Sequence, residues 1–97
     1  MSVKVIAEFN CNEGEAATFI ELCRNAFPET RNYDGCESID ISIDQENSNL
    51  LVMTENWESK KHHEAYLKFR TEDGTLAKLG AMLSGPLKIS YLDLTDA

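Results

Sequence analysis

Four segments of this chain alternate hydrophobic and polar residues with a period of two, which is the pattern of β-strands with one buried face. In the first, residues 3–10, the hydrophobic side chains of Val3, Val5, Ala7 and Phe9 all fall on one side. The other three segments are residues 37–44, 50–58 and 87–94. Helical spacing separates the first segment from the second and the third from the fourth, so the predicted order is β-α-β-β-α-β.

The first helical segment follows the turn that contains Asn12. We expect Asn12 to cap this helix, with Glu15 completing a capping box three residues later. A hydrophobic stripe at spacings of three and four then runs to Phe27. The helix is predicted to end near Ala26 or Phe27, because proline disfavours helical backbone in the residue before it and Pro28 comes next.

The second helical segment starts after Ser59, which has the side chain of an N-cap. The sequence Thr-Glu-Asp-Gly at residues 71–74 is predicted to break it in two, and Gly85-Pro86 to end the resumed helix. One face of the first half carries polar and aromatic side chains together, namely those of His63, Tyr66, Leu67 and Arg70.

This order of elements defines an α+β, ferredoxin-like fold with an antiparallel four-stranded sheet and helices on one face. A chain of 97 residues has room for one core, so residues 1–97 are predicted to form a single domain. The run Leu-Leu-Val-Met at residues 50–53 is apolar on both faces. The second face therefore needs cover, and we expect a homodimer in which two sheets pack together as a dimeric α+β barrel.

The charge of the chain excludes several kinds of partner. Nine Lys+Arg against seventeen Asp+Glu give a net charge of −8, which disfavours nucleic acid and anionic membrane surfaces. No hydrophobic run is long enough for a signal peptide or a membrane span, so we expect a cytoplasmic protein. Cys11, Cys23 and Cys36 lack metal-binding or CxxC spacing and are interpreted as reduced thiols.

Several short stretches together resemble the antibiotic biosynthesis monooxygenase family of dimeric α+β barrels. The resemblance covers about residues 3–94 and is carried by Val5–Glu8, Tyr33–Cys36, Glu55–Ser59, His62–Leu67 and Met82–Pro86. It implies a pocket between the sheet and the helices of each subunit. It also implies a cofactor-free oxygenase for quinol-like or polyketide aromatics, although other family branches degrade haem or process a phosphorylated sugar.

The chain departs from the family pattern where chemistry is expected. Tyr66 stands where the family often has histidine, and His63 where an aliphatic residue is usual. The positions that match the haem-degrading branch are Phe9, Tyr66 and the region of Leu79, none of which carries that branch's residue. Haem degradation is therefore disfavoured, and we expect no cofactor.

The two histidines are neighbours on a helix and point about 100° apart, so they cannot chelate one metal ion, and no metal site is expected. His63 shares a face with Tyr66 and is our candidate general base for a phenol or hydroquinone. The alternative is a buried, hydrogen-bonded core histidine. His62 is expected to be exposed, yet close enough to serve as a substrate contact.

The remaining candidates are aromatic or amide side chains near the predicted pocket. Tyr66 and Trp57 would position an aromatic substrate, or else pack as core residues. Phe9, Phe27 and Asn56 are candidate substrate contacts. Asn56, like Glu55 and Asn10, faces either a ligand or the dimer barrel, and Arg70 is expected on the surface or in a salt bridge.

Two functions remain open at this point. The first is a small monooxygenase that oxidises a quinol-like or other electron-rich aromatic with O₂, with His63 as base and Tyr66 and Trp57 as catalytic partners. The second is a non-catalytic dimeric barrel that binds a small apolar ligand in a stress or regulatory role.

Overall fold

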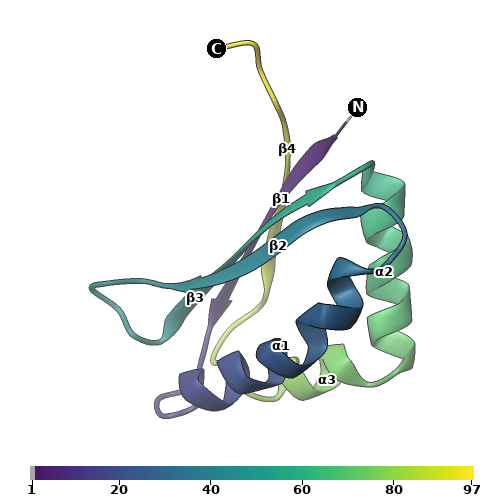
Figure 1. The fold of residues 1–97 in the computed structure, drawn as a ribbon. Helices are drawn as coiled ribbons and strands as arrows, with labels where there is room; N and C mark the ends of the chain where they lie inside the picture. The colour runs from purple at the N-terminus through teal and green to yellow at the C-terminus, as the bar shows by residue number, and fades with distance from the viewer. Residues whose placement is uncertain (1) are drawn as a thin grey trace.

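The computed structural model describes residues 2–97. The strands form one antiparallel sheet in the order β2-β3-β1-β4, which confirms the ferredoxin-like α+β class (Figure 1). All four strands lie within one residue of their predicted bounds. In chain order the elements are β1 (Val3–Asn10), α1 (Ala16–Arg31), β2 (Cys36–Ile43), β3 (Leu50–Trp57), α2 (Lys60–Glu72), α3 (Thr75–Gly80) and β4 (Lys88–Asp93).

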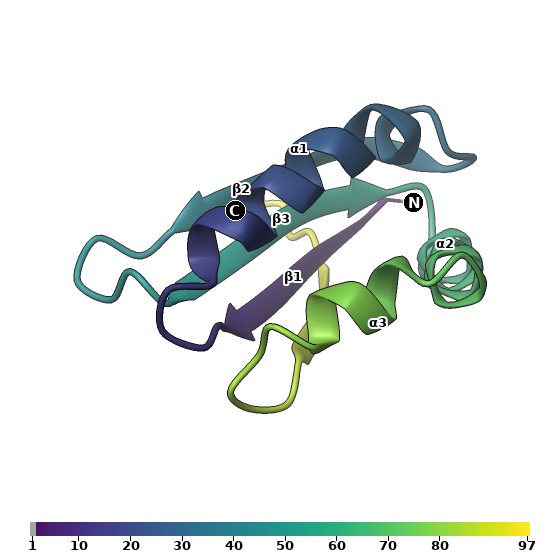
Figure 2. The same ribbon diagram turned by 90° about the horizontal axis from the view of Figure 1, so that it is seen from below.

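The helices cover one face of the sheet and the core lies between them (Figure 2). In β1 and β3 every second side chain is buried against the helices, as the period-two pattern predicts. One cluster centres on Phe9, Phe19 and Leu51. A second cluster packs Trp57 and Tyr66 against the start of β1.

Helix α1 continues through Pro28 to Arg31, so the prediction that it ends near Ala26 or Phe27 is wrong. Pro28 lies on the exposed side of the helix, where water can satisfy the carbonyl that loses its partner. The last turn is held by side chains, since Thr30 Oγ1 donates to the carbonyl of Ala26 at 3.2 Å and Asn32 Nδ2 to that of Pro28 at 3.1 Å.

The predicted cap of α1 is also wrong. Glu15 occupies the N-cap position and makes no capping hydrogen bond through its side chain. Instead, the backbone N–H of Glu15 donates to the carbonyl of Asn12 at 3.0 Å, and Gly14 turns the chain with φ of 83°. A tight turn therefore replaces the capping box.

The second helical region is broken as predicted. Ser59 Oγ accepts a hydrogen bond from the backbone N–H of His62 at 3.2 Å, which confirms Ser59 as N-cap of α2. Gly74, with φ of 85°, separates α2 from α3. Helix α3 ends at Gly80 rather than at Gly85, because the chain then turns so that Leu83 bridges to Cys11 beside the sheet.

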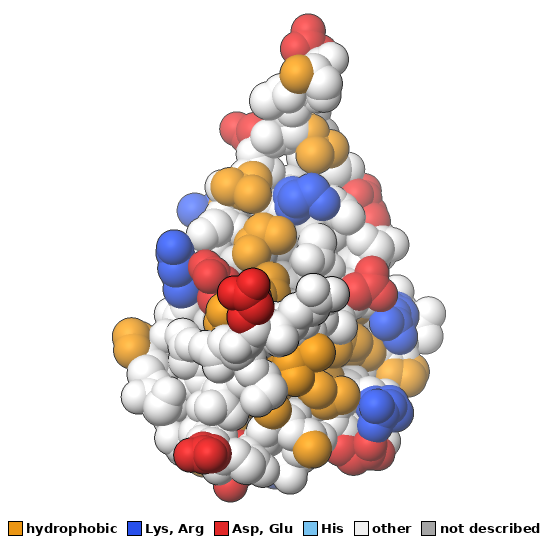
Figure 3. Space-filling view, turned by 90° about the vertical axis from the view of Figure 1, so that its left-hand side faces the viewer, with side chains coloured by type: hydrophobic (Ala, Val, Ile, Leu, Met, Phe, Trp, Pro, Cys, Tyr) orange, Lys and Arg blue, Asp and Glu red, His pale blue; other side chains and the backbone are white. Residues whose placement is uncertain are grey.

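The other face of the sheet has no covering element among residues 2–97. Register places Ile6, Val52 and Leu92 on it, together with polar residues such as Asn56. Leu92 is 44% exposed and Leu94 beyond it 57%. Figure 3 shows one side of the molecule, where hydrophobic side chains lie between charged ones up to the tapering C-terminal end.

Candidate functional site

A cavity of about 50 Å³ lies between the sheet and the helices, where the resemblance places a pocket. Each of the seven helices and strands contributes at least one residue to its wall, which is mostly apolar. The predicted contacts Phe9 and Phe27 both line it. The ionisable side chains on its wall are Cys23, Glu55, His63, Tyr66 and Arg70.

Glu55 is a carboxyl group inside the core. It lies on β3 in phase with Met53 and Trp57, so the strand directs it toward the helices, and it is 3% exposed. Trp57 Nε1 donates a 2.9 Å hydrogen bond to Glu55 Oε1. Burial raises the pKa of Glu55 to about 7, and the bond from Trp57 only partly opposes this shift. Glu55 can therefore hold or release a proton near neutral pH.

His63 projects from α2 toward Glu55 and is 2% exposed. Its Nδ1 lies 2.8 Å from the Tyr91 hydroxyl, and its Nε2 lies 3.6 Å from Glu55 Oε1. Burial lowers the pKa of His63 to about 4, so the imidazole is neutral near pH 7. His63 does line the cavity beside Tyr66, but at neutral pH Glu55 is the stronger base of the two.

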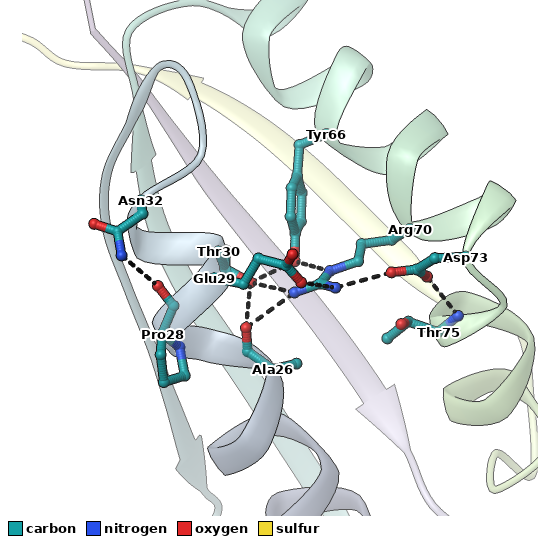
Figure 4. A network of polar contacts seen from close by, with 9 residues as sticks. All are labelled: Ala26, Pro28, Glu29, Thr30, Asn32, Tyr66, Arg70, Asp73 and Thr75. Atoms are coloured by element: carbon teal, nitrogen blue, oxygen red, sulfur yellow. Dashed lines mark hydrogen bonds and ion pairs between the residues drawn. The ribbon is translucent and has the colours of Figure 1, made fainter.

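Tyr66 presents its ring to the cavity while its hydroxyl is held elsewhere. The hydroxyl lies 2.6 Å from Thr30 Oγ1 and accepts a 2.8 Å hydrogen bond from Arg70 Nε (Figure 4). Burial raises the pKa of Tyr66 despite these bonds, so the phenol stays neutral. Tyr66 can form a wall for an aromatic ligand, but its hydroxyl is already engaged.

Two settings were expected for Arg70, a surface position or a salt bridge, and the structure shows a buried residue in salt bridges. It is 4% exposed and makes ion pairs from Nη1 to Glu29 at 3.0 Å and Asp73 at 2.9 Å. Its Nη2 donates to the Ala26 carbonyl at 2.9 Å. The guanidinium therefore ties α1 and α2 to the turn before α3 (Figure 4).

Trp57 stands behind the cavity rather than on its wall. The side chain is fully buried, and its ring centre lies 5.1 Å from that of Tyr66 and 5.3 Å from that of His63. Its one polar contact is the hydrogen bond to Glu55. The structure thus places Trp57, Tyr66 and His63 next to one another, and Trp57 contacts the wall of the cavity through its hydrogen bond to Glu55.

His62 and Asn56 point away from the cavity. His62 Nδ1 lies 2.6 Å from Ser59 Oγ, at the start of α2, and its ring packs against the turn at Gly35. Asn56 is on the opposite face of the sheet, where its Nδ2 donates to Ser38 Oγ at 2.8 Å. Neither residue contacts a ligand held in this cavity.

Comparison with known proteins places the chain in a family. A family model described as antibiotic biosynthesis monooxygenase matches residues 2–71. The chain belongs to this family. No protein of curated function matches it.

Solved structures share the family fold over nearly the whole chain. The Mycobacterium tuberculosis protein Rv0793 is 25% identical, with a TM-score of 0.81 over 100% of this chain and 98% of that chain. A structure titled antibiotic biosynthesis monooxygenase is 18% identical, with a TM-score of 0.86 and coverage of 96% and 98%. A conserved protein from Methanosarcina mazei Go1 is 20% identical, with a TM-score of 0.85 and coverage of 94% and 90%.

Sequence reasoning did not settle the place of three residues of this antibiotic biosynthesis monooxygenase domain: it left open whether Glu55 faces a ligand or the dimer barrel, left open whether Arg70 lies on the surface or in a salt bridge, and gave Thr30 no role. Glu55 carried a signal, since a carboxyl group in phase with Met53 and Trp57 must enter the core. Arg70 carried one as well, because it lies four residues after Tyr66 on the same helix face. Thr30 carried none, because α1 was expected to end before it.

Two further findings concern what the domain could hold or cross. Within residues 2–97, no three His, Cys, Asp or Glu side chains are grouped as metal ligands would be. None of the helices in this part of the chain has the length and hydropathy to cross a membrane.

Proposed function

We propose that this domain is a cofactor-free oxygenase that oxidises a small electron-rich aromatic molecule with O₂. One observation carries the proposal: a carboxyl group with a pKa of about 7, Glu55, lies on the wall of an otherwise mostly apolar cavity. A general base works best when its pKa lies near the working pH. An apolar surrounding also suits O₂ and an uncharged aromatic ring.

Glu55 rather than His63 is the proposed base. The Glu55 carboxylate accepts the hydroxyl proton of a phenol, and the electron-rich ring carbon of the resulting anion forms a bond to O₂. The peroxide then breaks its O–O bond, leaving one oxygen on the ring as a quinone carbonyl. The other oxygen leaves as water with the ring hydrogen and the proton returned by Glu55. All electrons come from the substrate, so no further reductant is needed.

The other cavity residues would support this step. Phe9 and Phe27 would hold the ring, and the ring of Tyr66 would form part of the wall. Trp57 and neutral His63 would keep the Glu55 side chain in place. Asn56 and His62 lie outside the cavity. They would contact a substrate only if that substrate extended beyond the cavity, or if a second copy of this chain brought them to its site.

The size of the cavity narrows the substrate class. A volume of about 50 Å³ has space for only a few water-sized molecules. A cavity that binds benzene has about 150 Å³, so even a single aromatic ring would enter only as side chains of the wall move. A polycyclic substrate would need a larger rearrangement, and we therefore favour a substrate with a single ring.

Oxygen uptake with a panel of single-ring phenols and hydroquinones tests the proposal. We expect consumption that Glu55→Gln abolishes and that Glu13→Gln, an exposed loop substitution, leaves unchanged. Product mass after incubation in ¹⁸O₂ should show one labelled oxygen. No consumption above the Glu55→Gln background across the panel would remove the catalytic function.

The small cavity and the engaged Tyr66 hydroxyl favour a second candidate, a non-catalytic protein that binds a small apolar ligand. Under this function, apolar molecules protect the domain against thermal unfolding but are recovered unchanged. The oxygen-uptake panel therefore separates the two candidates.

A further inference from the structure

Three polar side chains from different elements form a row in space that leads from the cavity to the edge of the sheet. Glu55 is on the interior strand β3, His63 on α2 and Tyr91 on the edge strand β4. His63 stands between the other two, with Nε2 3.6 Å from Glu55 Oε1 and Nδ1 2.8 Å from the Tyr91 hydroxyl. Glu55 and His63 are buried, whereas Tyr91 is partly exposed.

The chemistry of these groups differs from that of Trp57, the other polar contact of Glu55. An indole N–H only donates and cannot accept a proton from a carboxyl group. A neutral imidazole has one donor and one acceptor nitrogen, and a phenol oxygen both donates and accepts. Of the two side chains in polar contact with Glu55, His63 is thus the one that can accept its proton.

We infer that Glu55, His63 and Tyr91 form a proton relay between the cavity and solvent. The inference rests on the proposed function, in which Glu55 is the base, and adds the route by which that base meets bulk water. Glu55 passes its proton to Nε2 of His63 as their separation closes to hydrogen-bond length. Nδ1 passes its proton to the Tyr91 oxygen, and the Tyr91 hydroxyl proton goes to water. Each transfer breaks one bond to hydrogen and forms one. At the end Glu55 carries a negative charge, water carries the proton, and His63 and Tyr91 are neutral as before.

Charged groups surround the two ends of the relay without interrupting it. Lys60 Nζ lies 4.6 Å from the centre of the Tyr91 ring. Burial is the main cause of the raised pKa of Tyr91, and the negative charge of Glu64, which like Lys60 is on α2, raises this pKa further. At the inner end, the charge of Glu55 raises the pKa values of Cys36 on β2 and Tyr66 on α2, although burial raises both more. Neither is hydrogen-bonded to Glu55 or to His63.

The single tryptophan allows a test without any substrate. Trp57 Nε1–H donates to Glu55, so its ¹⁵N signal reports the ionisation of that carboxyl group. Relaxation dispersion of this signal at the titration midpoint measures how fast Glu55 exchanges its proton. We expect Tyr91→Phe to slow the exchange roughly tenfold or more while the midpoint stays near that of the wild type.

Tyr33→Phe is the matched control, because it also removes a tyrosine hydroxyl, from a residue whose ring packs against Trp57 but that is not part of the relay. Slowing in Tyr91→Phe alone supports the relay. Equal exchange rates in the wild type and Tyr91→Phe, equal slowing in both variants, or a Trp57 signal that does not titrate would each overturn it. Oxygen uptake fails or succeeds independently of these rates, so loss of the proposed function is distinguishable from loss of the relay.

Discussion

Arg70 Nε donates a 2.8 Å hydrogen bond to the hydroxyl of Tyr66, one turn earlier on α2. The same guanidinium holds the end of α1 through Ala26 and Thr30. The wall of the cavity and the junction of the helices therefore depend on one buried cation.

Replacing Arg70 should destabilise the domain more than replacing any exposed arginine. Arg70→Met leaves the buried Tyr66 hydroxyl and the Ala26 carbonyl without this donor, and we expect a loss of about 3 kcal/mol in unfolding free energy. Arg24→Met removes only the exposed pair with Glu21 and should cost about 0.5 kcal/mol or less. Urea denaturation measures both, and equal losses would show that the network adds no stability.

The buried pair of Glu55 and His63 predicts the pH dependence of stability. The folded pKa of Glu55, about 7, exceeds its ordinary 4.5, so its contribution is present at low pH and is lost as the pH rises from 4.5 to 7. The folded pKa of His63, about 4, lies below its ordinary 6.5, so stability is lost as the pH falls from 6.5 to 4. The two effects offset each other in the wild type.

Glu55→Gln removes one side of this balance. We expect its unfolding free energy to rise with pH between 4 and 6.5. Relative to the wild type, it should gain about 3 kcal/mol between pH 4.5 and 7. Denaturant titrations across this pH range measure the difference, with exposed Glu13→Gln as the control. Parallel curves for Glu55→Gln and the wild type would mean that Glu55 titrates normally.

Pro28 costs stability in a helix that nonetheless forms around it. Pro28→Ala restores the N–H that can bond to the carbonyl four residues earlier, and we expect a gain of about 1 kcal/mol or more. The gain should appear as a higher urea midpoint without a change in the slope. A loss of stability would instead indicate that the ring of Pro28 makes a contact that the helix needs.

The uncovered face of the sheet predicts the oligomeric state. We expect the wild type to sediment at twice the 10.9 kDa of one chain, because a second sheet would cover Ile6 and Val52. Val52→Lys should shift the mass to one chain and keep the fold, whereas Ala65→Lys on the exposed side of α2 should leave the dimer intact. A wild-type mass of one chain at micromolar concentration would contradict the dimer.

Most of the fold could be predicted because its signals are local. Alternating side chains locate each strand, and Gly74 supplies the backbone conformation that breaks the second helical region. The end of α1 could not be predicted, because Arg70 and Thr30 together hold a turn that Pro28 alone would weaken. At the site, the sequence pattern places Phe9 on the buried face of its strand, and Phe27, His63 and Tyr66 on the core-facing sides of their helices, so their position at the cavity was predictable.

The sequence by itself determined which side chains enter the core, since period and spacing decide the face on which each one lies. Only the tertiary structure decided their chemistry. Glu55 becomes a candidate base near neutral pH because its surroundings, among them Trp57 and His63 of α2, exclude water from it, and burial makes His63 too weak a base. A pKa depends on the solvation of a group by residues distant in the chain, which no local pattern of β3 or α2 records.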